Sequence, residues 1–261
     1  MTFVKRDMRT LIAAFAVCAL AGSAAVGATD AWSDDSEHVT RTLKLEPGGT
    51  VRVKSFSGRV TIAAADSSEV TVDAVRRAPR SRLDRIKLEI RSEGTRTVVI
   101  DANRRERSWW EFSGSNVVET DLDIKVPRRS NIDVSVFSAP VTVEGVEGSY
   151  KLHSFSARMT LNDVAGPVEA HSFSGPIQIR EKAFAAGQTI DVHTFSGSID
   201  LHLPDSARAA LSFNSFSGHL DCEMPLTIRT NSRRALRGEL GGGGSAELRF
   251  KTFSGSVRIN R

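Results

Sequence analysis

An alternation of apolar and polar residues around a sharp corner decides the fold, and it is clearest in TIDVHTFSGSIDL, residues 189–201. Ile190 and Val192 share one face of an extended strand with Thr194, and the residues between them face the other way. After Gly197 the alternation resumes. The stretch therefore predicts two half-buried strands joined by a bend.

The same corner recurs along the chain. Through the middle, its phenylalanines fall 18, 18, 22 and 21 residues apart. This is the length of one coil of a parallel β-solenoid and too short for a pair of helices. We predict an all-β, single-domain parallel β-helix, or β-solenoid, of about 18–22 residues per coil. The structural corner residues are Phe56, Phe137, Phe155, Phe173, Phe195, Phe216 and Phe253, with Gly58, Gly175, Gly197, Gly218 and Gly255.

Each corner residue type suggests a role. Glycine reaches positive φ without a Cβ clash, so we expect it to turn the strand. The inward hydroxyl before each phenylalanine should hydrogen-bond from coil to coil as a serine/threonine ladder. For the phenylalanines, we favour packing over the end of the core rather than an exposed aromatic strip, because a solvent-exposed row of aromatic rings would promote aggregation.

Two intervals break the repeat. Residues 70–126 read as strands around a short basic helical turn, which we interpret as a lateral strand-hairpin extension of the first coils. An eighth Phe-Ser-Gly at Phe112 is interpreted as coincidental. Between Phe216 and Phe253 there is room for two coils, with a degenerate corner at residues 230–233.

The extension carries a basic and aromatic loop. Guanidinium groups suit phosphate, and indole rings suit a lipid headgroup region, so the loop is a candidate contact with anionic lipid or an envelope polymer. The alternative is a solvated loop balanced by its own glutamates. The candidate binding residues are Arg104, Arg105, Arg107, Trp109 and Trp110.

The N-terminus has the pattern of an export signal. A basic stretch precedes an alanine-rich apolar run, and small residues follow near Ala28. The expected organisation is a signal peptide over 1–28, a flexible segment over 29–41 and the repeat domain over 42–261. The residues before Cys18 do not match the usual pattern of a lipoprotein signal. Cleavage would leave Cys222 alone, so no intramolecular disulfide is expected.

The charge balance argues against nucleic acid as a partner. The formal net charge is +4, and removing Lys5, Arg6, Arg9 and Asp7 with the signal leaves +2. No apolar run after the signal is long enough to span a membrane.

Histidine recurs two positions before three consecutive phenylalanines, at His153, His171 and His193. Their rings should lie about 5 Å apart in one column followed by Asn214. Such a column is a candidate metal site or pH-sensitive element. A solvated ladder is the favoured alternative, because no carboxylate or cysteine lies in the same column.

The chain resembles the DUF4097 family of candidate adhesins, which is similar to the toast-rack domains of envelope-stress proteins. The resemblance covers roughly residues 42–261 and rests on the corners, on returns such as 145–148 and 164–168, and on the glycine-rich turn at 241–244. It implies a parallel β-helix exposed to the cell envelope or its exterior, with no catalytic residues to carry over. The constancy of phenylalanine at the corners departs from what we expect of such domains.

These features favour an exported, non-catalytic adhesin-like or scaffold module, periplasmic or at the cell surface, with no cofactor. Its partners would be an envelope protein, a glycan or an anionic lipid surface. The alternative is an envelope-stress sensor that binds a protein. A polysaccharide-acting β-helix enzyme is less favoured, because Asp191, Asp200 and Asp221 are scattered without a paired acid and base.

Overall fold

The computed structural model describes residues 35–105 and 117–261, and β-strands account for nearly all regular structure there. The first half contains β1 (Asp35–Lys44), β2 (Thr50–Ser55), β3 (Val60–Ala65), β4 (Glu69–Ala78), α1 (Arg80–Arg85), β5 (Ile86–Glu93), β6 (Thr97–Arg105), β7 (Glu119–Pro127), β8 (Asn131–Val136), β9 (Val141–Glu144) and β10 (Tyr150–Ser154). The second half contains β11 (Met159–Ala165), β12 (Val168–Ser172), β13 (Ile177–Ala183), β14 (Thr189–Thr194), β15 (Ile199–His202), β16 (Ala209–Ser215), β17 (Leu220–Cys222), β18 (Leu226–Asn231), β19 (Ala235–Leu240), β20 (Ala246–Thr252) and β21 (Val257–Asn260).

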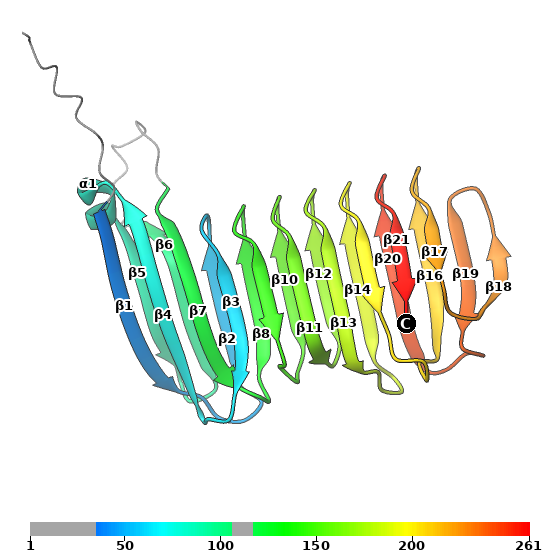
Figure 1. Cartoon of the computed structure of the whole chain (residues 1–261), viewed down its shortest axis with the longest axis horizontal. Coiled ribbons are helices and arrows are strands. Elements are labelled where there is room, and N and C mark those ends of the chain that lie inside the picture. The colour runs from blue at the N-terminus through cyan, green and yellow to red at the C-terminus, as the bar shows by residue number, and fades with distance from the viewer. Residues whose placement is uncertain (1–34, 106–116) are drawn as a thin grey trace, which may run out of the picture. The chain divides into compact units, whose positions relative to one another are not determined.

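The strands form two sheets, and each coil contributes one strand to each (Figure 1). The first sheet has the order β1-β4-β7-β3-β9-β11-β13-β15-β21-β17. The second has the order β18-β19-β16-β20-β14-β12-β10-β8-β2-β6-β5. Neighbouring coils pair in parallel, which confirms the predicted β-solenoid.

The register places equivalent residues of successive coils side by side. Leu152 pairs with Ala170, which pairs with Val192, and all three are buried. Their side chains belong to one continuous hydrophobic cluster that takes residues from both sheets. The alternation read from the sequence is thus the alternation between this core and the outer face of each sheet.

Residues 70–126 extend both sheets strand by strand at their N-terminal end. β6 and β7 continue the second and first sheets in parallel beyond β2 and β3. β4 and β1 then follow β7, and β5 follows β6, all antiparallel. The prediction of a flexible segment over 29–41 is wrong from Asp35 onward, because Asp35–Lys44 pairs with β4 along its whole length. Phe112 lies outside the described residues.

The coils do not stack in chain order at the C-terminal end. β20 lies between β14 and β16, so the last coil is inserted between two earlier ones. Residues 230–233 do not form a corner, because β18 and β19 make an antiparallel hairpin that continues the second sheet beyond β16. No described helix is long and apolar enough to cross a membrane.

Candidate ligand-binding groove

Each coil presents its histidine and phenylalanine positions on the outer face of the second sheet. In β10, Leu152 and Ser154 are buried and His153 is partly exposed, and Phe155, directly after the strand, is exposed. The same alternation recurs in β12 and β14. Strand periodicity therefore separates the core-facing hydroxyls from an outward row of rings.

The phenylalanine rings stack on one another in a ladder. From Phe56 to Phe216, successive centroids lie 4.6–5.0 Å apart and the planes differ by only 2–5°. Most of these rings remain 43–52% exposed. The expectation that the rings cover the end of the core is therefore wrong, since the ring faces are covered mainly by other rings and the edges remain accessible. The spatial order is Phe56, Phe137, Phe155, Phe173, Phe195, Phe253 and Phe216.

The corner glycines are required by close coil-to-coil contact. Of the five, only Gly58 has a positive φ, so the expected left-handed turn is wrong for the other four. A Cβ on Gly197 would lie 2.2 Å from the carbonyl oxygen of Gly175, and one on Gly255 would lie 2.0 Å from that of Gly197. A side chain at Gly197 or Gly255 would force its own coil and the neighbouring one to shift apart, although alanine is accommodated at the equivalent Ala157.

The inward hydroxyls stabilise their own corners. Thr194 Oγ1 accepts from the Gly197 N–H at 2.8 Å, and Ser154 Oγ accepts from the Ala157 N–H at 2.8 Å. These bonds replace the expected ladder between neighbouring hydroxyls. A hydroxyl three residues before a turn N–H satisfies it locally and leaves the strand ladder intact.

The histidines form the predicted column. The ring centroids of His153 and His171 lie 5.1 Å apart, and those of His171 and His193 lie 4.8 Å apart. Burial and the two flanking imidazoles lower the pKa of His171 below its usual 6.5. The column continues to Lys251 before it reaches Asn214, because the last coil is inserted between them.

A third row lies two positions earlier in each strand and carries mixed charge. Asp191 lies 2.9 Å from His193, and Glu169 lies 3.4 Å from His171. Arg52 pairs with Asp133 at 3.0 Å in the same row. The described residues contain no group of three or more His, Cys, Asp or Glu side chains arranged to hold a metal ion.

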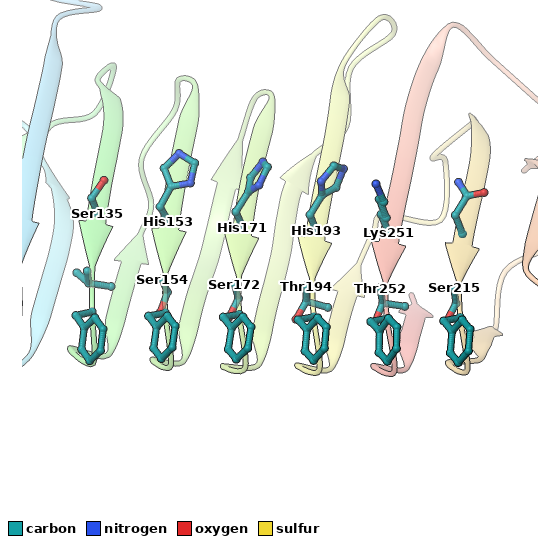
Figure 2. A pocket seen from close by; sticks show the side chains of 18 of the residues that line it. Ser135, His153, Ser154, His171, Ser172, His193, Thr194, Ser215, Lys251 and Thr252 are labelled. Atoms are coloured by element: carbon teal, nitrogen blue, oxygen red, sulfur yellow. The ribbon is translucent and has the colours of Figure 1, made fainter.

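Together, the phenylalanine and histidine rows border a groove of about 1080 Å³. Figure 2 shows the histidines and Lys251 in one row, with the hydroxyl residues Ser154, Ser172, Thr194, Thr252 and Ser215 along the floor. Arg234, from the turn of the β18–β19 hairpin, closes one end, with its guanidinium carbon 4.4 Å from the Phe216 ring centroid. Sequence reasoning missed Arg234 and Lys251, because their places depend on the inserted coil and on the hairpin.

Where the structure describes the basic extension, most of its arginine side chains contact other residues of the chain. Arg76 is 3% exposed, pairs with Glu37 and donates to the Ile86 carbonyl. Arg104 pairs with Glu89. The remaining candidates were Arg105, Arg107, Trp109 and Trp110. Arg105 ends β6, and the other three lie outside the described residues.

The carboxylates considered for catalysis do not converge. Asp200 accepts from the Asn260 amide at 2.8 Å on the first sheet, whereas Asp191 contacts His193 on the second. Asp221 lies 3.9 Å from Arg258. These carboxylates thus lie apart, each in contacts with its own neighbours.

The fold and groove define a two-sheeted parallel β-solenoid with a row of exposed aromatic rings on one sheet. The family model described as Toastrack DUF4097 matches residues 130–260, so the chain belongs to this family. No curated protein matches the sequence.

Solved structures resemble the chain at low sequence identity. A candidate cell adhesion protein from Clostridium sporogenes shares 9% identity, with a TM-score of 0.53 over 86% of this chain and 99% of that one. A candidate adhesin from Bacteroides fragilis shares 13% identity, with a TM-score of 0.29 over 85% and 97%. A candidate lipid binding protein from Parabacteroides distasonis shares 12% identity, with a TM-score of 0.34 over 86% and 97%. Only the first has a TM-score high enough to support the fold.

Proposed function

We propose that this chain is an exported, non-catalytic, adhesin-like module of the bacterial cell envelope that holds an elongated ligand along its aromatic groove. The observation that carries the proposal is the phenylalanine ladder, whose rings are 43–52% exposed from Phe137 to Phe216. Contiguous exposed apolar surface is a hazard that soluble proteins keep chiefly at interaction sites. Membership of the DUF4097 family supports an envelope role.

In this proposal residues 1–28 act as the export signal, and the mature domain begins near β1. A scaffold that binds a protein partner, as a stress sensor would, is the alternative within the same class. The groove favours a narrow ligand, because a stable protein interface buries about 800 Å² per partner and the ladder is only one ring wide.

Binding to fractionated envelope tests the proposal. Immobilised protein should retain material from a cell-envelope extract, and Phe155→Ser with Phe173→Ser should abolish that retention. Ile228→Ser is the matched control, because Ile228 is 51% exposed on β18, outside the groove. Retention that survives the double substitution would contradict the proposal, and a single stoichiometric protein partner would favour the sensor.

A second contact with anionic surfaces is proposed for Arg105, Arg107, Trp109 and Trp110. Cationic side chains bind anionic lipid in a salt-dependent way, and indole rings favour the headgroup region. Replacing Arg107, Trp109 and Trp110 by serine should reduce binding to phosphatidylglycerol vesicles at low salt. If the unmodified protein does not bind such vesicles, this contact does not exist.

A further inference from the structure

The groove admits at most one unbranched chain. Its two walls are set by residues two positions apart, such as His153 and Phe155, whose Cα atoms lie about 7 Å apart. Its long axis crosses the strands, from β8 to β16. Five ring spacings of 4.8–5.0 Å separate Phe137 from Phe216, so the apolar wall is about 24 Å long.

The apolar wall offers ring edges and crosses interior strands, so two modes of binding are not available to a ligand. Groups that stack flat on aromatic faces, as nucleobases do, find those faces covered by neighbouring rings. A peptide that binds by strand addition needs a free sheet edge, but the groove crosses interior strands that already pair on both sides. A flexible hydrocarbon chain needs neither a free ring face nor a backbone partner.

Among the described residues, the opposite wall carries unpaired positive charge only at its β16 end, because Glu169 and Asp191 of the adjacent row contact His171 and His193. From β8 to β16 the wall itself contains no carboxylate, and its members are Ser135, His153, His171, His193, Lys251 and Asn214. Arg234 adds a second cation at the β16 end.

The cations at this end are not neutralised by nearby acids. Within the described part of the chain, neither Lys251 nor Arg234 forms a salt bridge with a carboxylate, whereas the neighbouring Arg249 contacts Glu247 and lies 4.0 Å from Asp191. An anionic group placed at the β16 end would meet two available positive charges. From that group, the apolar wall would extend along the groove toward β8.

We propose that the groove binds a long-chain fatty acid, with its carboxylate near Lys251 and Arg234 and its hydrocarbon chain along the phenylalanine edges. This inference rests on the proposed function and names the ligand class. One leaflet of a bilayer is about 15 Å of hydrocarbon, so the 24 Å wall accommodates a whole membrane acyl chain. A two-chain phospholipid does not fit a single-file groove.

Displacement of cis-parinaric acid by palmitate tests the inference. The fluorescence of cis-parinaric acid should rise on binding, and palmitate should reverse the rise. Phe173→Ser should weaken palmitate binding about fivefold, because roughly 1 kcal/mol of apolar contact is lost. The control Ile228→Ser should leave the affinity unchanged. If Phe173→Ser does not fold, Phe173→Leu replaces it and should bind palmitate nearly as tightly as the parent protein does. The charge variants described below then test the assignment of the ligand.

The headgroup assignment has its own variants. Lys251→Gln with Arg234→Gln should weaken palmitate about tenfold, and should leave palmityl alcohol unaffected because the alcohol carries no charge. Lys151→Gln, an exposed cation in the third row, is the control.

Three outcomes would overturn the inference: no displacement by palmitate, equal losses in the groove and control variants, or equal losses for acid and alcohol. If envelope material is retained through Phe155 and Phe173 while palmitate does not bind, the ligand class is wrong and the proposed function stands. If neither binds, both fail.

Discussion

The ring of Phe195 stacks on that of Phe253 at 4.8 Å, although Phe216 is the next corner along the chain. Phe253 in turn stacks on Phe216 at 4.8 Å. The last coil thus lies between two coils that precede it, and the groove is continuous only when the C-terminus is in place.

Removing residues 246–261 should therefore destabilise the whole C-terminal half. β20 and β21 pair with strands on both sides, so their loss leaves β16 and β17 without their parallel partners. We expect a lowered melting temperature and a second transition in calorimetry. The comparison is a chain in which a short glycine-serine linker replaces residues 226–240. Equal melting of the two variants would contradict the prediction, because the hairpin borders only the sheet end.

Phe195→Ala should cost about 2 kcal/mol of unfolding free energy. The substitution removes two ring stacks worth about 0.5–1.5 kcal/mol each and the contact area of a half-exposed side chain. Phe250→Ala, in the core at 1% exposure, should cost about 3–5 kcal/mol. Urea unfolding measures both, and equal losses would show that the ladder is packed like the core.

Gly197→Ala should cost about 3 kcal/mol. Its Cβ would lie 2.2 Å from the Gly175 carbonyl oxygen, and relief requires two stacked backbones to separate. Ser198→Ala, at the next and exposed position, is the control and should change stability by less than about 0.5 kcal/mol. A neutral effect at Gly197 would mean that the coils are not packed this closely.

His171 should titrate below pH 6.5. Because its pKa is lowered by folding, the unfolded chain binds the proton first, and stability should fall as the pH drops below about 6.5. Proton NMR of the three imidazoles measures the midpoints. His171→Asn should flatten the pH dependence of stability in that range, and a midpoint at or above 6.5 in the parent protein would contradict the shielding described for the column.

Glu181 should have the opposite effect. Burial raises its pKa from 4.5 to about 8, so the folded chain keeps a proton that the unfolded chain releases, and stability should fall as the pH rises between these values. Glu181→Gln removes the titrating group and should raise stability at pH 8 on the order of 2 kcal/mol. Unfolding measured at pH 5 and pH 8 checks the sign. A variant that gains nothing at pH 8 would mean that the carboxyl ionises freely.

The corner motif and its alternation were enough to predict the solenoid, the core-facing rows and the histidine column, because strand periodicity fixes which residues share a face. The place of the Phe253 coil could not be predicted, since similar corners are equivalent partners for stacking. The role of Gly197 depends on a carbonyl of another coil, which no local pattern reveals. Arg234 reaches the groove only because it lies on the β18–β19 hairpin. The sequence of that hairpin was interpreted as part of a coil.

Photo-crosslinking would show whether the phenylalanine edges hold an acyl ligand. Benzoylphenylalanine would replace Phe173 in one protein and Ile228 in another, each would be irradiated with envelope extract, and the modified peptides would be weighed by mass spectrometry. We predict an adduct with the mass of a long-chain fatty acid at position 173 and none at position 228. Equal labelling at both positions, or no acyl adduct at position 173, would show that the phenylalanine ladder does not hold an acyl chain.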